Sequence, residues 1–267
     1  MNPAGVIPSG GMSAGDRAND PAEKARAWRD ATQAAVCDVL RPWTHGTIVR
    51  ATRYPDYWDL NVVRVEDDPA MSVGELTALA NEALAGLGHR RLDFDLPSAA
   101  EPRRAEFEAR GWRATRLVWM RHEGPSPAAQ QIPVETVPID AVQELRAAWH
   151  QEDFPGHDPV RYPDQAREVA QLRHAQVVAA RAGGAPVGFA QLERHGSAAE
   201  ITEVYVGPEH RGAGHGTALT RAAVAAAIEA GVEDLWICAE ADGRPKELYS
   251  RLGFRPAWTT VEFLRLD

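Results

Sequence analysis

The stretch VYVGPEHRGAGHGT, residues 204–217, joins the end of an apolar strand, a basic glycine-rich turn and the beginning of a helix. Glycines at 212, 214 and 216 let backbone N–H groups converge, and the helix N-terminus adds the positive end of its dipole. Arg211 adds a full positive charge. The turn is therefore suited to hold phosphate, whereas a plain strand-to-helix connection would not need three alternating glycines and an arginine.

Two common phosphate-binding loops do not fit this turn. The NTPase loop requires Gly-Lys followed by Ser or Thr, and this turn contains no lysine. The dinucleotide fingerprint requires a third glycine at position 217, where Thr217 stands. The turn therefore indicates another kind of phosphate-bearing ligand.

The turn resembles the acyl-CoA signature of the GNAT superfamily of N-acetyltransferases, V-x-P-x-x-R-G-x-G-x-G, which links that fold's fourth strand to its third helix. The matching residues are Val206, Pro208, Arg211, Gly212, Gly214 and Gly216. Downstream, LYSRLGF at 248–254 resembles the family's second landmark, a tyrosine on a short helix before Gly-Phe. The resemblance covers residues 134–267 and implies an α/β fold with a mixed sheet.

The resemblance also implies acetyl-CoA as co-substrate. The CoA diphosphate would lie on the turn, contacting Arg211, Gly212, Ala213, Gly214, His215, Gly216 and Thr217. The pantetheine arm would pair with the strand backbone at Val204, Tyr205 and Val206. Many family members carry an asparagine after the fifth strand, where this chain has Ala241 and Asp242, and Asp242 is the candidate for that contact.

Two residues suit the chemistry of acetyl transfer. An alkylamine is protonated at neutral pH and must lose a proton before it attacks a thioester. Glu203 precedes the turn on the strand that would carry the thioester, and a half-buried carboxylate there would have a raised pKa. Tyr249 is placed to protonate the departing thiolate, and the N–H of Val204 could polarise the carbonyl. The alternatives are a solvated strand residue for Glu203 and core packing for Tyr249.

The segment WHQEDFPGHDP, residues 149–159, lies between two expected helices, and in the family this segment forms a wall of the acceptor site. Its acidic side chains and aromatic rings could bind a cationic amine. The candidates are Glu152, Asp153 and Asp158, with a merely solvated acidic loop as the alternative. The histidines nearby show no metal-ligand spacing, so we expect no metal site.

Composition describes an ordinary globular chain of 267 residues, 44% hydrophobic and 25% charged. A net charge of −9 argues against nucleic acid as a partner. The longest apolar run, residues 222–228, is too short to cross a membrane, and the first residues do not read as a secretory signal. Two widely separated cysteines favour a reducing compartment, so we expect a cytoplasmic protein. As partners we expect a small-molecule amine substrate and, in the case of a homodimer, a second copy of the chain; a monomer is the other expected state.

Hydrophobic periodicity predicts alternating strands and helices. Helices are expected at 22–40, 74–87, 103–110, 141–151, 163–174, 216–230 and 246–251. Strands are expected at 47–53, 60–65, 92–96, 113–120, 134–138, 176–182, 187–193, 201–206, 234–239 and 258–266. The chain divides into a tail at 1–21, a first half at 22–122, a linker at 123–131 and a second half at 132–267.

The two halves repeat the same order of elements. LNVVRV at 60–65 overlays ITEVYV at 201–206, and Gly111-Trp112 overlays Gly253-Phe254, with offsets of 141 and 142 positions. This order favours two tandem GNAT-like domains. In the first half, EDDPAMSVG at 66–74 replaces the basic glycine turn and Phe107 replaces the tyrosine, so this half is expected to be degenerate and not to bind acyl-CoA.

These observations favour an acetyl-CoA-dependent N-acetyltransferase that transfers acetyl directly to a primary amine in a ternary complex. Two alternatives stay open. The acceptor could be a peptide N-terminus or a lysine, which would need an open groove. The chain could also be a binding module that responds to acyl-CoA without turnover.

Overall fold

The computed structural model describes residues 19–127, 132–157 and 160–267. Its helices are α2 (Pro21–Ala34), α3 (Val73–Ala83), α4 (Pro97–Ala100), α5 (Arg104–Ala109), α6 (Gln143–Asp153), α7 (Tyr162–Leu172), α8 (His215–Glu229) and α9 (Arg244–Arg251). None of these helices is long and apolar enough to cross a membrane.

The strands of the described residues form one mixed sheet in the order β1-β2-β3-β4-β11-β5-β10-β9-β8-β7-β6. The strands of the first half are β1 (Val39–Trp43), β2 (Gly46–Arg50), β3 (Val62–Val65), β4 (His89–Phe94) and β5 (Arg113–His122). Those of the second half are β6 (Val134–Val137), β7 (Gln176–Ala182), β8 (Ala185–His195), β9 (Ala198–Val206), β10 (Asp234–Glu240) and β11 (Phe254–Leu266). The mixed α/β fold is as the sequence predicts.

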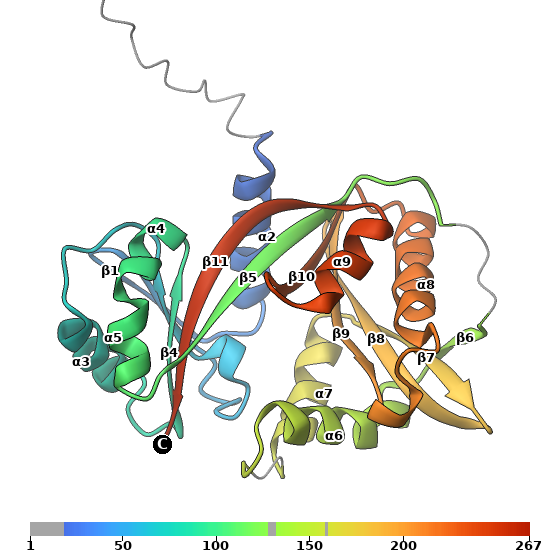
Figure 1. Cartoon of the computed structure of the whole chain (residues 1–267), viewed down its shortest axis with the longest axis horizontal. Helices are drawn as coiled ribbons and strands as arrows, with labels where there is room; N and C mark the ends of the chain where they lie inside the picture. The colour runs from blue at the N-terminus through green and yellow to red at the C-terminus, as the bar shows by residue number, and fades with distance from the viewer. Residues whose placement is uncertain (1–18, 128–131, 158–159) are drawn as a thin grey trace, which may run out of the picture.

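The two halves exchange strands in the middle of this sheet. The final strand, β11, pairs with β4 of the first half, whereas β5 of the first half pairs with β10 of the second. Between them, β5 and β11 pair antiparallel from Phe254 with His122 to Leu264 with Arg113. Figure 1 shows these two strands crossing the molecule together. A cut within 123–131 would therefore not release two complete sheets.

Helices cover both faces of the sheet. On one face, α3 and α5 enclose a core around Leu76, Phe94 and Phe107, and α8 and α9 enclose another around Leu219 and Ile237. The opposite face carries α2, α6, α7 and the loop 51–61, in three smaller apolar clusters. Amphipathic helices on a two-sided sheet account for this layering.

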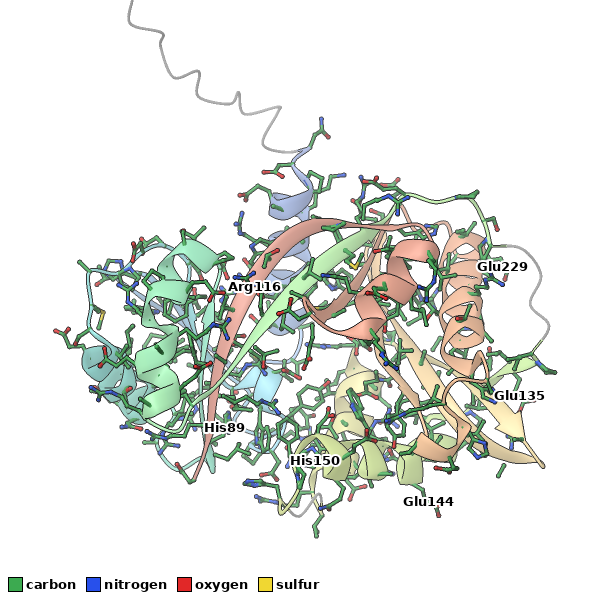
Figure 2. The ribbon with its side chains drawn as sticks, viewed as in Figure 1. His89, Arg116, Glu135, Glu144, His150 and Glu229 are labelled. Atoms are coloured by element: carbon green, nitrogen blue, oxygen red, sulfur yellow. The ribbon has the colours of Figure 1, made fainter. Side chains whose placement is uncertain are left out.

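Aromatic rings connect the loop 51–61 to the second half. The ring of Trp58 lies 5.6 Å from that of His89 on β4 and 5.4 Å from that of His150 on α6. Figure 2 labels these two histidines, which come from different halves of the chain. The ring of Phe154, at 4.6 Å from Trp58, completes the contact. The halves thus meet through side chains as well as through strands.

The main error of the sequence prediction lies at the N-terminal helix. The helix expected at 22–40 ends at Ala34, and Val39–Trp43 forms β1, which pairs with β2. Val36 and Val39 are β-branched, and Pro42 cannot continue a helix but is tolerated in an edge strand. The remaining predicted helices and strands are present, with bounds that differ by a few residues.

We expect Phe263→Ala to lower the free energy of unfolding by about 3–5 kcal/mol. Phe263 comes from β11 but is buried in the first half, stacked on Phe107 at 4.2 Å. Denaturant unfolding measures the change, with Ile228→Ala, 42% exposed on α8, as the control. A loss below about 1 kcal/mol would contradict the strand exchange.

Candidate active site

The site begins at a fork in the sheet. β9 and β10 pair in parallel only from Asp234 with Ala198 to Ile237 with Ile201. Beyond that point β10 continues along β5 as far as Glu240, while β9 continues along β8. The edge of β9 that faces β10 therefore has no strand partner over residues 202–206. Such an edge can accept an extended ligand as an additional strand.

A bulge in β9 opens the fork. The register between β8 and β9 shifts between Phe189, opposite Tyr205, and Gln191, opposite Thr202. Glu203 lies in this bulge with a φ of +52°, which is uncommon for a residue other than glycine. An extra residue bends the bulged strand, so β9 turns away from β10 here. The strained backbone is consistent with a functional position.

The predicted strand, glycine turn and helix are confirmed. After β9, a short 3-10 turn leads to Gly212 and Gly214, whose φ angles of +78° and +91° favour glycine. Gly214 caps α8, which begins at His215 and has no side-chain cap. The first amides of a helix lack helical acceptors. An open anion-binding helix terminus results.

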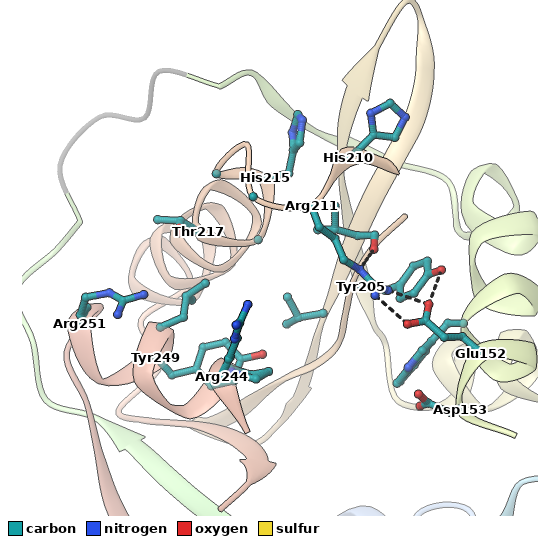
Figure 3. A pocket seen from close by; sticks show the side chains of 18 residues that line it. Glu152, Asp153, Tyr205, His210, Arg211, His215, Thr217, Arg244, Tyr249 and Arg251 are labelled. Carbon is teal, nitrogen blue, oxygen red and sulfur yellow. Dashed lines mark hydrogen bonds and ion pairs between the residues drawn. The ribbon is translucent and has the colours of Figure 1, made fainter. Parts of the chain in front are cut away.

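A cleft of about 680 Å³ lies between this turn and α9, as Figure 3 shows. The predicted cofactor residues that line it are Val204, Tyr205, Val206, Arg211, Gly212, Gly214, His215, Gly216 and Thr217. Arg244 and Arg251 of α9 also line it, and neither has an ion-pair partner among the described residues. Neither arginine was predicted as a site residue, because the recognisable landmark in this helix is its tyrosine.

Arg211 and Glu152 form a pair that the sequence did not predict. The Arg211 guanidinium donates to both carboxylate oxygens of Glu152, each at 2.7 Å (Figure 3). Its Nε donates to the Val206 carbonyl at 2.9 Å. The hydroxyl of Tyr205 also donates to Glu152, at 3.2 Å. The pair of Arg211 and Glu152 connects the glycine turn to α6. Arg211, predicted to contact the cofactor, and Glu152, predicted to contact the amine, are therefore bound to each other in this structure.

Two predicted residues do not line the cleft, and a third is not among the described residues. Ala213 does not line the cleft, although both its neighbours do. Asp242 lines a separate cavity with Arg104 and Arg116, because β10 follows β5 away from the fork. Asp158 lies outside the described residues. Asp153 does line the cleft, at the C-terminal end of α6.

A smaller cavity of about 230 Å³ lies behind the cleft, at the fork. It shares Trp149, Val204 and Tyr249 with the cleft and contains both Glu203 and Glu200. A third cavity, of about 410 Å³, adjoins it and shares Asp59, Trp149, Tyr162, Glu200 and Cys238. The three cavities adjoin one another between the glycine turn and the space between the two halves, and the first and third also share Trp149 and Asp153.

Glu203 is buried against a cation. Its Oε2 accepts a hydrogen bond of 2.9 Å from Nε of Arg146, whose side chain is fully buried. Its Oε1 is buried with no hydrogen-bond partner among the described residues. Burial raises the pKa of this carboxyl, and Arg146 opposes the increase. The predicted base therefore has one oxygen in an ion pair and one without a partner.

Glu200, which sequence reasoning missed, lines both inner cavities. Its Oε2 accepts a hydrogen bond of 2.7 Å from Nε1 of Trp28 on α2, and it has no ion pair among the described residues. Burial, followed by repulsion from Glu193, raises its pKa to about 8. A carboxyl with that pKa is suited to proton transfer near neutral pH. Its environment arises from α2, which the local sequence does not reveal.

Tyr249 and Cys238 complete the fork. The side chain of Tyr249 is 6% exposed, and burial raises its pKa well above the usual value. Its hydroxyl therefore stays protonated and can donate a hydrogen bond. Burial likewise raises the pKa of the Cys238 thiol, which disfavours the nucleophilic thiolate. Among the described residues, no group of three His, Cys, Asp or Glu side chains could hold a metal ion.

The fold and cleft define an α/β protein with a glycine-rich turn and an uncapped helix start beside a forked strand pair. Residues 140–254 match the model of the acetyltransferase (GNAT) family. An uncharacterized N-acetyltransferase of Methanocaldococcus jannaschii is 37% identical over 93 residues, which are 31% of this chain. The match spans 40% of the length of that curated relative.

Solved structures resemble a larger part of the chain. A functionally unknown conserved protein from Staphylococcus epidermidis has a TM-score of 0.65 at 14% identity, with 86% of this chain and 94% of that chain covered. A GCN5-related N-acetyltransferase from Kribbella flavida has a TM-score of 0.52 at 19% identity, with 92% and 95% covered. At these identities the likeness concerns the fold.

We expect Gly216→Ala to weaken acetyl-CoA binding at least about tenfold without loss of stability. A Cβ at Gly216 would meet Leu248 Cδ1 at 3.8 Å and Val206 Cγ2 at 4.0 Å, both ordinary contacts, but it would occupy the cleft. Alanine also favours the helix. Calorimetric titration and thermal unfolding measure the two effects. Gly214→Ala is the comparison, since its φ of +91° makes it destabilising, and an unchanged affinity of Gly216→Ala would contradict the cleft assignment.

Proposed function

We propose that the protein is an acetyl-CoA-dependent N-acetyltransferase that acts on a small-molecule amine by direct attack in a ternary complex. The observation that carries this proposal is the set of three adjoining cavities that connects the glycine turn, through Glu203 and Tyr249, with the space between the halves. The family match and the relatives named as N-acetyltransferases support acyl transfer. CoA would enter from the turn and the amine from the opposite side.

The residues of the cleft suit CoA. The free amides at the start of α8 and the guanidinium groups of Arg244 and Arg251 would receive its phosphates. The unpaired edge of β9 at residues 202–206 would pair with pantetheine, which would bring the thioester to the fork. The N–H of Val204 is the candidate donor to the thioester carbonyl.

At the fork, two carboxylates would handle the amine. Glu200 would accept the proton of the incoming ammonium, because its raised pKa of about 8 suits proton transfer near neutral pH. The free Oε1 of Glu203 would accept a hydrogen bond from the same nitrogen and orient its lone pair. Glu203 would thus contact the substrate, and Glu200 would take the role of base that was predicted for Glu203.

The transfer itself would need no covalent enzyme intermediate. The amine nitrogen bonds to the acetyl carbonyl carbon, the carbon–sulfur bond breaks, and CoA leaves as a thiolate that gains a proton. Tyr249 would donate a hydrogen bond to that sulfur, which its protonated hydroxyl permits. The raised pKa of Cys238 argues against an acyl-cysteine, so direct attack is the simpler route.

We also propose that the first half is a degenerate copy of the second. Supporting this, β3, α3, β4, α5 and β5 follow the same order as β9, α8, β10, α9 and β11, and α3 and α8 begin 142 positions apart. Both β3–β4 and β9–β10 are parallel pairs. Phe107, which stands where Tyr249 does, is fully buried and stacked on Phe263.

The N-terminus of α3, which corresponds to that of α8, is already occupied by the carboxylate of Glu75. Ser72 caps α3 by accepting from the Glu75 amide at 3.3 Å, and Glu75 Oε2 accepts from the Ser72 amide at 2.8 Å. This capping box satisfies amides that in α8 are free. The carboxylate would also repel a diphosphate.

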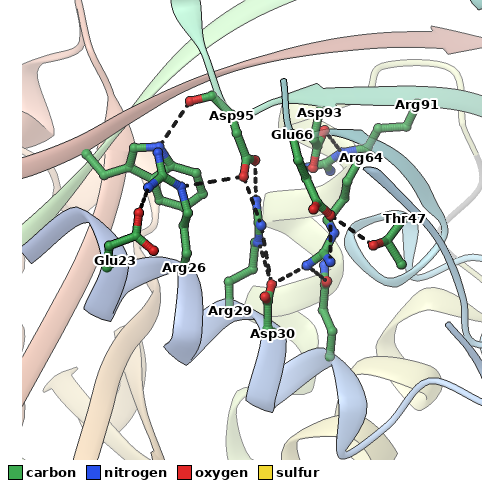
Figure 4. Close-up of polar contacts among 12 residues, drawn as sticks. Glu23, Arg26, Arg29, Asp30, Thr47, Arg64, Glu66, Arg91, Asp93 and Asp95 are labelled. Atoms are coloured by element: carbon green, nitrogen blue, oxygen red, sulfur yellow. Dashed lines mark hydrogen bonds and ion pairs between the residues drawn. The ribbon is translucent and has the colours of Figure 1, made fainter. Parts of the chain in front are cut away.

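Several arginines of the first half are engaged in ion pairs. Arg29 bonds to Asp95 at 2.5 Å, Arg64 pairs with Asp30, and Arg91 bonds to Asp93 at 2.8 Å (Figure 4). The first two pairs hold α2 against the sheet. Buried ion pairs of this kind serve the fold, because breaking one would leave a costly unpaired charge.

The arrangement also bears on the alternatives. A peptide acceptor would need an open groove, whereas the third cavity lies between the two halves and is lined from both. A binding module without catalysis would not need two carboxylates and a tyrosine at the fork. Turnover distinguishes this module from an enzyme, because acyl-CoA would stabilise either one.

We expect Glu200→Gln to lower kcat about 10²–10⁴-fold and to remove the acidic limb of its pH profile. In the unaltered enzyme kcat should fall as pH drops below about 8, because Glu200 becomes protonated and can no longer accept the proton. Thiol release at saturating amine measures this. Glu229→Gln, on the exposed end of α8, is the control.

Two further variants test the other roles at the fork. Glu203→Gln should lower kcat but keep the acidic limb, and Tyr249→Phe should lower kcat at every pH. If the acidic limb of the kcat profile disappears in Glu203→Gln but remains in Glu200→Gln, then Glu203 and not Glu200 is the base. Unchanged rates in all three variants would refute the roles proposed here.

Calorimetric titration with acetyl-CoA should give one site per chain, because α8 begins with free amides beside Arg244 and Arg251, whereas the start of α3 carries a capping box. Gly216→Ala should weaken that site, while Ser72→Ala in the first half should leave its affinity unchanged. Two equal sites would be incompatible with a degenerate first half.

A further inference from the structure

The third cavity has the composition of a site for a cation. Its volume is about 410 Å³, and both halves line it, with Trp58, Arg91 and Leu117 from the first and His150, Phe154 and Glu240 from the second. This size suits a small organic molecule. The third cavity reaches the fork at Glu200, so under the function proposed above it would hold the acceptor amine. This inference rests on that proposed function.

Aromatic rings form one wall of the cavity. Trp58 contacts His150 and Phe154, and His150 stacks on Tyr162 at 4.4 Å. Burial lowers the pKa of His150, so its ring is neutral at neutral pH and does not repel a cation. Aromatic faces attract ammonium groups and also pack against methylene chains.

The carboxylates of the cavity fall into two groups. Asp56, Asp59 and Glu262 are neutralised by ion pairs with Arg161 and Arg91. Glu200, Asp153 and Glu240 have no ion-pair partner within 4.0 Å among the described residues. No ion pair neutralises this second group, although Glu200 accepts a hydrogen bond from Trp28 and Asp153 accepts one from Trp149.

The carboxylates of this second group lie at opposite ends of the cavity. Glu200 is level with Trp236 on β10, and Glu240 lies four residues further along that strand, which is roughly 13 Å at about 3.3 Å per residue. Asp153 is near Glu240: burial raises its pKa, Arg113 opposes this, and the charge of Glu240 adds to the increase. The nearby Arg113 guanidinium lies over the Phe154 ring at 4.7 Å.

An independent feature marks the inner end. The side chain of Glu203 is 5% exposed and lines the adjoining smaller cavity, and its Oε1 is buried without a hydrogen-bond partner among the described residues. A buried acceptor without a donor is costly to the protein unless a ligand supplies one. An amine nitrogen arriving beside Glu200 would supply that donor.

We propose that the acceptor is an aliphatic di- or polyamine: one nitrogen is acetylated at the fork between Glu200 and Glu203, while a second, cationic nitrogen is held at the outer end by Asp153 and Glu240. The methylene chain between the nitrogens lies along the aromatic wall. The reaction is the one already written, with one acetamide formed, one thioester cleaved and one proton released.

Three probes of matched length test this proposal: cadaverine, n-pentylamine and δ-aminovalerate. They present the same reacting nitrogen with a second group that is cationic, absent or anionic. We expect kcat/KM, measured by thiol release, to be at least about tenfold higher for cadaverine than for pentylamine, and lowest for aminovalerate. Raising the ionic strength should reduce the preference for cadaverine.

The double variant Asp153→Asn, Glu240→Gln should bring the ratio of cadaverine to pentylamine close to one. The matched control is Glu144→Gln, an exposed acid on the outer side of α6 that lines none of the cavities (Figure 2). Calorimetric titration with cadaverine in the absence of acetyl-CoA gives a second readout, in which only the double variant should lose binding.

The outcomes separate this inference from the proposed function. Acetylation of pentylamine or another amine without preference for cadaverine, or an unchanged ratio in the double variant, would overturn the diamine assignment alone. Absence of thiol release with every amine, despite binding of acetyl-CoA, would overturn the proposed function as well.

Discussion

The antiparallel pairing of β5 with β11 is the constraint on which the rest of the molecule depends. It joins the two halves in one sheet, because each strand has its other edge on a strand of the opposite half. The same pairing places Leu117 and Leu264 from different halves on the lining of one cavity. The proposed acceptor site therefore exists only when the strands are exchanged. Neither half by itself would enclose it.

The fork combines several features that oppose stability. Glu203 has a left-handed φ, its carboxylate is buried against Arg146, and one of its oxygens has no partner. Glu200 is buried with a raised pKa. Each would be unfavourable in an ordinary strand, and together they lie where β9 leaves β10. Such a concentration is typical of sites where strain and altered pKa values serve chemistry.

Local patterns in the sequence were sufficient for most elements and for the glycine turn. Gly212 and Gly214 have the positive φ angles that the turn requires, and Tyr249 lies at the fork as its distance from Gly-Phe indicates. Long-range features were beyond reach. Glu200 accepts a hydrogen bond from Trp28, which lies 172 positions away in the sequence. Arg211 of the glycine turn pairs with Glu152 of α6, which lies 59 positions away. The strand exchange leaves no local signal, because β5 and β11 look like ordinary final strands.

The order of the strands has a consequence for biosynthesis. Translation delivers β5 before β10 and β11, so the nascent first half carries β4 and β5 without the strands that will separate and cover them. Apolar side chains such as Phe94 and Phe107 lack their contact with Phe263 until β11, the last strand in the sequence, has been synthesised. Unpaired strand edges invite aggregation. The ribosome-bound chain is therefore a natural client for chaperones until β11 has emerged.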